Sequence, residues 1–172
     1  MPQQGARSTE DTSDREVIFT RIFDAPRELV WKAFTDPKQV VKWWGPNGFT
    51  TTNQEMDVRP GGIWRHTMHG PDGTDYYNKC KFLEVAKPER IVYVQSGGKE
   101  DDSGMPCEVT WTFEAQGAKT KLTGRMVFPS AATLEHVAKI YGVIEGGKQT
   151  LERLAGHLLA IADGGNRGRS RS

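Results

Sequence analysis

The chain has 172 residues, 36% of them hydrophobic and 26% charged, and its 23 Lys and Arg residues nearly balance its 22 Asp and Glu residues. This length suits one hydrophobic core better than two separate domains. The charge balance provides no overall field that would attract nucleic acid or an anionic membrane. We therefore expect a single domain with no nucleic-acid partner and no membrane partner.

Cysteine usage and hydropathy narrow the class further. Cys80 and Cys107 lie far apart without the paired spacing of a zinc module or a disulfide framework, which favours buried free thiols. No apolar run approaches the roughly 18 residues of a membrane span. The first 16 residues have no apolar core of the signal-peptide kind. The expected compartment is cytoplasmic.

The N-terminal third predicts one strand followed by two short helices. Residues 1–14 are polar and are expected to form a disordered leader. Residues 15–23 alternate β-branched and aromatic side chains on both faces, which indicates a strand covered on both sides or flanked by a hairpin partner. Helix start signals follow at Asp24-Ala25-Pro26 and again at Thr35-Asp36-Pro37, and Gly45-Pro46 stops the second helix.

From Phe49 onward the hydrophobic period is mostly two, and turn residues interrupt it at each joint. With the first strand, this gives about seven strands. A polar, acidic loop is expected at 97–106, and Ser130 is placed to cap a helix over 131–141. The predicted further strands are 49–58, 63–69, 76–85, 90–96, 107–114 and 120–128.

Residues 143–162 form a long amphipathic pattern that predicts the central helix of the domain. Gly147 occupies the middle of its apolar face, where glycine costs about 1 kcal/mol relative to alanine. Two explanations stay open: the glycine leaves an empty space, or a sheet residue approaches the helix closely there. Residues 15–163 are thus the expected domain, and 164–172 an expected flexible, basic tail.

Six short motifs resemble those of a known protein family. They are RIFDAP (21–26), VWKAFTDP (30–37), WWGP (43–46), DVRPGG (57–62), GPDG (70–73) and PERIV (88–92). In this order they resemble bacterial proteins related to the activator of the heat-shock-protein-90 ATPase, which belong to the START-like, helix-grip superfamily called SRPBCC. The resemblance implies an α+β fold in which a curved antiparallel sheet surrounds a long C-terminal helix, with a cavity between them. Fold alone does not assign an activity.

The sequence contains no complete motif for binding a metal or a nucleotide, and none for a catalytic nucleophile. The run GVIEGGK at 142–148 has the spacing of a phosphate-binding loop, but Gln149 replaces the required Ser or Thr, and the preceding segment is helical. His66 and His69 are three apart on a predicted strand, so they face opposite sides and cannot share a metal ion. We expect no metal and no cofactor, and the chain has no GxSxG elbow.

Alternation along the strands predicts a cavity lining instead. His66 and Asn78 stand out, because a polar group on an apolar inner face costs about 1–3 kcal/mol unless it is hydrogen-bonded. For His66, a satisfied core residue and a ligand-facing residue are equal alternatives. Cys80 stands where the family often has glycine, which bears on the cavity volume. The predicted ligand-binding residues are Trp44, Trp64, His66, Met68, Asn78, Phe82, Trp111, Met126, Gly147 and Leu151.

Three functions are compatible with these patterns. The leading hypothesis is the binding of a small, mostly apolar molecule in a cavity between sheet and helix. The second is a cyclase or hydrolase, for which His66 is the only ionisable inward residue, and the sequence shows no catalytic constellation. The third is a co-chaperone-like module that acts through its surface. A chaperone partner and a homodimer are therefore left open.

Overall fold

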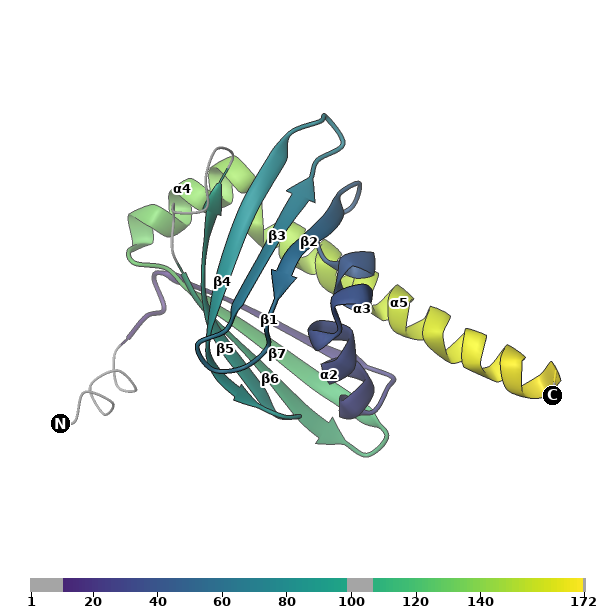
Figure 1. Ribbon diagram of the computed structural model, residues 1–172. Coiled ribbons are helices and arrows are strands. Elements are labelled where there is room, and N and C mark those ends of the chain that lie inside the picture. The colour runs from purple at the N-terminus through teal and green to yellow at the C-terminus, as the bar shows by residue number, and fades with distance from the viewer. Residues whose placement is uncertain (1–10, 99–106, 172) are drawn as a thin grey trace.

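The computed structural model describes residues 11–98 and 107–171 and shows seven strands and four helices in them (Figure 1). The predicted leader up to residue 10 and most of the predicted acidic loop lie outside these ranges. The elements are β1 (Glu16–Phe23), α2 (Arg27–Thr35), α3 (Pro37–Trp43), β2 (Thr50–Met56), β3 (Ile63–His69), β4 (Asp75–Ala86), β5 (Arg90–Gly98), β6 (Cys107–Gln116), β7 (Lys119–Val127), α4 (Ala131–Tyr141) and α5 (Val143–Arg171).

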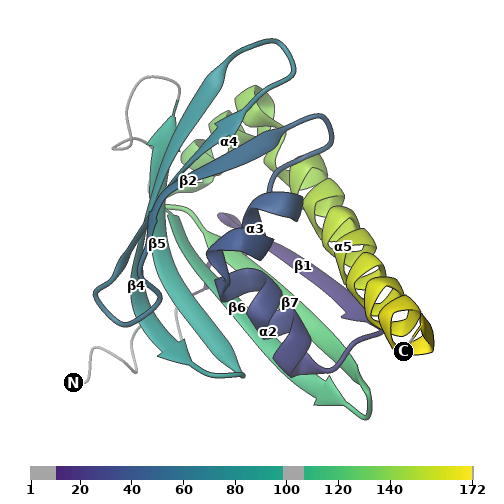
Figure 2. The ribbon, with the colours of Figure 1, turned by 45° about the vertical axis from the view of Figure 1, so that its right-hand side comes forward.

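All seven strands belong to one antiparallel sheet, in the order β1-β7-β6-β5-β4-β3-β2. The sheet curves, and α2, α3 and α5 lie on its concave side (Figure 2). Helix α5 contacts β1 as well as α2, α3 and α4. The predicted α+β helix-grip architecture is confirmed.

Local signals explain where the helices begin and end. The Asp36 side chain accepts a hydrogen bond from the Lys38 backbone N–H (2.9 Å), which caps α3. Ser130 caps α4 in the same way, because its Oγ accepts from the Thr133 backbone N–H (3.1 Å). Gly142 adopts a left-handed φ of 60° and separates α4 from α5. Gly142 is therefore the C-cap of α4.

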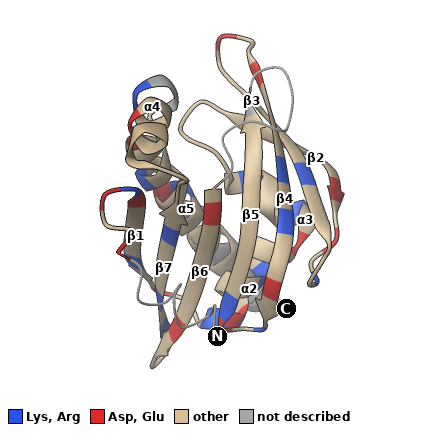
Figure 3. Cartoon of the chain, turned by 90° about the vertical axis from the view of Figure 1, so that its left-hand side faces the viewer, with Lys and Arg blue, Asp and Glu red and all other residues tan. Residues whose placement is uncertain are grey.

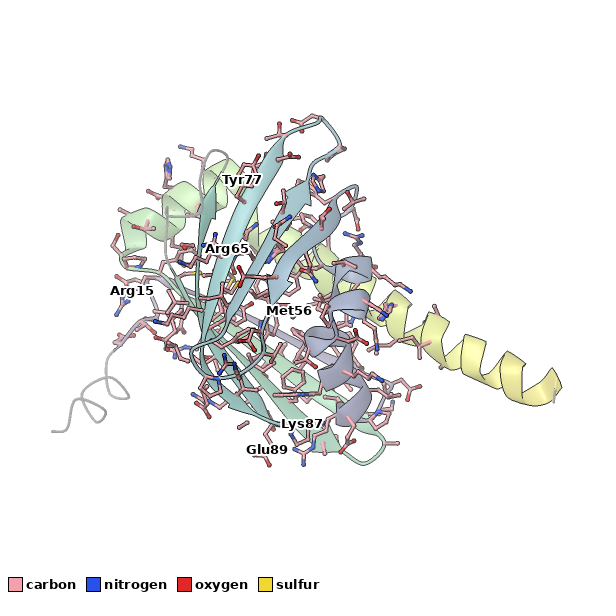
Figure 4. All side chains as sticks on the ribbon, viewed as in Figure 1. Arg15, Met56, Arg65, Tyr77, Lys87 and Glu89 are labelled. Atoms are coloured by element: carbon pink, nitrogen blue, oxygen red, sulfur yellow. The ribbon has the colours of Figure 1, made fainter. Side chains whose placement is uncertain are left out.

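Two details differ from the sequence-based boundaries. Helix α5 continues to Arg171 rather than ending near Ala162, and it extends past the sheet (Figure 1). Contacts with the domain begin before residue 15, since Thr12 is buried and receives a hydrogen bond from Arg125. Arg15, labelled in Figure 4, donates to the Phe128 carbonyl at 2.8 Å and ties the start of β1 to the end of β7.

Strand β1 lies at the edge of the sheet and carries apolar residues on both faces, but only one of these faces is buried. Val17, Phe19 and Phe23 are buried on the concave side. Ile18 and Ile22 point the other way and are each 54% exposed. Neither predicted environment is observed: the outer face of β1 is not covered, and its neighbour is the distant strand β7 rather than a hairpin partner.

In the view of Figure 3, acidic and basic residues are interspersed over the strands and loops. No helix in residues 11–98 and 107–171 is long and apolar enough to cross a membrane.

Candidate ligand-binding cavity

A cavity of about 220 Å³ lies between the concave face of the sheet and the first half of α5. Strands β1, β6 and β7 form one wall and β3 to β5 form another. The α3–β2 connection and the α4–α5 junction line the rest of the cavity, which is partly open to solvent. The lining is mostly apolar. Its larger members are Phe19, Trp44, Pro46, Met68, Tyr76, Tyr93, Val109, Trp111, Met126, Phe128, Val137 and Val143.

The polar groups of the lining are concentrated on β4 and β5. Asn78 Oδ1 accepts a hydrogen bond from Gln95 Nε2 (3.2 Å), and Asn78 Nδ2 donates to the Tyr76 carbonyl (3.2 Å). Trp111 Nε1 donates to the Tyr93 hydroxyl (3.1 Å). These bonds fix the side chains in place, so the cavity presents oriented polar groups beside a wide apolar surface.

The structure divides the ten predicted site residues into two groups. Six line the cavity: Trp44, Met68, Asn78, Trp111, Met126 and Gly147. The other four, Trp64, His66, Phe82 and Leu151, do not border it and are at most 4% exposed. They face the concave side as predicted, but packed neighbours separate them from the open space. Ligand binding by any of the ten stays a prediction.

Gly147 is explained by a close approach of the sheet. A Cβ atom at this position would lie 2.2 Å from Phe19 Cζ, which no real contact tolerates. The Phe19 ring of β1 thus packs directly on the helix backbone, and it borders the cavity as well. Gly124 likewise leaves room for the Trp111 ring, because a Cβ atom on Gly124 would lie 2.3 Å from that ring. The space that Gly147 leaves is occupied by an aromatic ring.

His66 is the least expected residue of the interior. Its side chain is 1% exposed, and its ring stacks on Trp64 with centroids 4.0 Å apart. Neither Nδ1 nor Nε2 has a hydrogen-bond partner among the described residues. Burial lowers the pKa of His66 to about 3, so the ring is neutral at physiological pH. The structure thus meets neither alternative in full: His66 is a core residue whose nitrogens the described chain does not satisfy, and it does not border the cavity.

His69 faces the opposite side of β3, as its spacing from His66 predicts. Its Nε2 lies 2.8 Å from Thr52 Oγ1, and its Nδ1 lies 2.8 Å from Asp75 Oδ1. A carboxylate in this position orients the imidazole ring, as in hydrolase triads. The cluster is on the convex side, where His69 is 38% exposed, and none of its members borders the cavity.

Two parts of the lining were not predicted from the sequence: the residues of β5, and Cys107 on β6. Gln95, Gly97 and Tyr93 line the cavity from alternate positions of β5, so the period-two rule used for the other strands would have found them. Both cysteines are free and buried, as predicted. Cys107 lines the cavity and Cys80 does not. Within the described ranges, no group of three His, Cys, Asp or Glu side chains gathers as metal ligands would.

A curved antiparallel sheet that encloses a cavity against a long C-terminal helix defines the helix-grip class of α+β proteins. Comparison of the sequence with family models places it more narrowly. The family described as "Activator of Hsp90 ATPase homolog 1-like protein" matches residues 24–158. The match spans most of the chain, which therefore belongs to this family. A search of curated proteins found no match.

Solved structures show the same fold. The crystal structure of protein Ms6760 from Mycobacterium smegmatis has a TM-score of 0.76 at 27% identity, covering 85% of this chain and 91% of that one. A solution structure from Arthrobacter aurescens has a TM-score of 0.81 at 24% identity, covering 88% and 90%. The AHSA1 protein from Silicibacter pomeroyi has a TM-score of 0.68 at 23% identity, covering 85% and 99%.

Proposed function

We propose that this protein binds a small, mostly apolar molecule in the cavity between the sheet and α5. The observation that carries the proposal is the lining itself, in which aromatic and methionine side chains surround the space and a few hydrogen-bonded amides stand on one wall. Ligand sites in proteins usually combine these two features. The wall formed by β1, β6 and β7, which includes Phe19 and Trp111, would hold the apolar body of the ligand.

The size of the cavity limits the ligand. An engineered apolar cavity of about 150 Å³ in another protein holds benzene. Sites for drug-sized molecules begin at about 300 Å³. At about 220 Å³, this cavity fits a molecule of one or two rings or a short branched chain better than a lipid or a large polyketide.

The lining favours binding over acid-base catalysis. The residues that border the cavity include no Asp, Glu, His, Lys or Arg in the part of the chain that the structure describes. His66, on which the enzyme alternative depended, lies behind the wall, and its lowered pKa of about 3 makes it a weak base. No described feature favours the surface-module alternative specifically, so a chaperone pull-down is its test.

The test uses naphthalene as a two-ring apolar probe. Native mass spectrometry of the purified protein would first show any molecule retained from expression. Titration with naphthalene, followed by its fluorescence, should then saturate at one equivalent. Val143→Phe, which puts a larger side chain into the lining, should abolish this binding. Ile144→Phe is the matched control, because Ile144 is the next residue on α5, is 46% exposed and does not border the cavity.

Two outcomes would contradict the proposal. If naphthalene and smaller rings such as benzene all fail to bind a protein that carries no retained molecule, the cavity is not a ligand site. If Val143→Phe and Ile144→Phe reduce binding equally, the probe binds elsewhere on the surface.

A further inference from the structure

His66 is a buried polar side chain that the described chain leaves without a hydrogen bond. A group of this kind is costly to bury, and in native proteins it usually has a partner of some kind. The ring is fixed between Trp64, on which it stacks, and Trp44, whose ring centroid lies 5.9 Å away. Its two nitrogens are therefore held in a defined orientation, and none of the described residues gives them a hydrogen bond.

Three neighbours of His66 border the cavity. Asn78 lies directly opposite His66 in the pairing of β3 with β4, and it lines the cavity. Met68 follows two residues later on the same face of β3 and also lines the cavity, as does Trp44. Of these three, Met68 is the unbranched and most adaptable side chain. Met68 is therefore the side chain that we expect to shift if the cavity opens towards His66.

The state of the ring selects the chemistry of the partner. Because burial lowers the pKa of His66 to about 3, the imidazole is neutral at pH 7 and offers one N–H donor and one nitrogen acceptor. A carboxylate or an ammonium group would bring an unpaired charge into this apolar interior, which is strongly unfavourable. A hydroxyl group donates or accepts, so it pairs with either nitrogen and with either tautomer of the ring.

We propose that the ligand carries an alcohol or phenol hydroxyl that passes Met68 and forms a hydrogen bond with the ring of His66. This inference rests on the proposed function, since it names the polar end of a molecule whose apolar body fills the cavity. Asn78, held by Gln95 and the Tyr76 carbonyl, borders the route that the hydroxyl takes. The class of ligand is thus a small hydroxylated ring compound or a short apolar alcohol.

The experiment compares 2-naphthol with naphthalene, which differ by one hydroxyl group. We expect 2-naphthol to bind the wild-type protein about tenfold more tightly than naphthalene, in keeping with one net hydrogen bond. In His66→Phe, which conserves an aromatic ring and removes both nitrogens, the two probes should bind with equal affinity. His69→Phe is the control, since it removes a histidine from the convex face and should keep the tenfold preference.

A second measurement uses the wild-type protein, so it does not depend on the folding of a variant. In a ¹⁵N NMR spectrum that detects imidazole nitrogens, 2-naphthol should shift the His66 signals and naphthalene should shift them less. The His69 signals should stay in place with both probes.

The outcomes separate this inference from the proposed function. If both naphthalene and 2-naphthol bind with the same affinity and the His66 nitrogens do not respond to the hydroxyl, the inference is wrong and the proposed function stands. The same holds if His66→Phe keeps the preference for 2-naphthol. If neither probe binds a protein free of retained molecules, both fail together.

Discussion

The concave face of the sheet is filled at one end and hollow at the other. At the filled end, under α2 and α3, the Phe34 ring meets the rings of Trp43, Trp111 and Phe113 with centroids 4.9 to 5.2 Å apart. At the hollow end, under the first half of α5, the facing positions include glycines and amides, and about 220 Å³ stays open. Both ends belong to one continuous sheet (Figure 2). Side-chain volume, rather than strand topology, therefore decides where this fold has a core and where it has a cavity.

Two aromatic residues bound the cavity on the side of the core. Trp111 belongs to the aromatic cluster through Phe34 and also lines the cavity. Phe19 lines the cavity and reaches the helix only because Gly147 has no side chain. The cavity is thus bounded by rigid aromatic rings on the side of the core, and by Met68 and the polar residues of β4 and β5 on the other side. The flexible and polar side is where we expect ligands to be discriminated.

The largest effect should come from the filled end. Phe34→Ala removes a ring that is 6% exposed and in contact with four other rings, so it should lower the free energy of unfolding by about 3–5 kcal/mol. Met126→Ala, at the cavity wall, should cost less, because the lost atoms border a space that already exists. Urea denaturation measures both. Equal losses for the two variants would mean that the ends do not differ in packing.

The contact between Phe19 and Gly147 should give the next largest effect. Gly147→Ala places a methyl group inside the Phe19 ring, and the resulting overpacking should destabilise the protein by about 1–3 kcal/mol in spite of the better helix propensity. Gly156→Ala is the matched control on the same helix. A Cβ atom there meets nothing within 4 Å, so the variant should be more stable by about 1 kcal/mol. If Gly147→Ala is also stabilising, the ring does not pack on the helix.

The dependence of stability on pH should report the burial of His66. Its pKa is about 3 in the folded protein, against 6.5 for an exposed histidine, so between these values the unfolded chain binds a proton that the folded chain does not. The full stability is present above pH 6.5 and falls as the pH is lowered towards 3. Between pH 7 and 5.5 this loss should be about 1 kcal/mol. Urea denaturation at both pH values measures it.

His66→Phe should remove this part of the pH dependence. His157 needs its own control, because burial and then Lys42 lower its pKa as well. His157→Gln should retain most of the wild-type loss between pH 7 and 5.5. An unchanged pH dependence in His66→Phe would show that the folded protein accommodates a charged His66.

The smallest effect concerns the two cysteine thiols. Cys107 borders the cavity, whereas Cys80 is buried away from it. Burial raises the pKa of Cys107 to about 12 and raises that of Cys80 well above its usual range, so both should react slowly with N-ethylmaleimide in the folded protein at pH 7. Cys107 borders the cavity and should be labelled before Cys80, as mass spectrometry of the peptides would show. If Cys80 were labelled first, the space accessible to the reagent would lie beside Cys80 rather than beside Cys107.

The same two cysteines should not form a disulfide. Both pair with Gln95, one from each side, so they lie on strands separated by β5. Two strand spacings amount to about 9.6 Å, beyond the Cα separation that a disulfide permits.

The sequence by itself determined the elements and their faces. Asp36 and Ser130 start helices, Gly142 ends one, and alternation along β3 places His66 inside and His69 outside. These features depend on neighbours within a few residues, where backbone geometry and hydrogen bonding have few solutions. The motif order also identified the family, which the match over residues 24–158 confirms.

The tertiary structure decided which inward residues border open space and which are packed. Period-two alternation places Trp64, His66 and Met68 on one face, but only Met68 reaches the cavity. Alternation also could not decide the role of Gly147, because that role depends on the Phe19 ring that packs against it. The cluster of Thr52, His69 and Asp75 joins three strands and has no local signal. Such contacts depend on how far the sheet curves around α5, and that curvature is set by all the side chains packed between them at once.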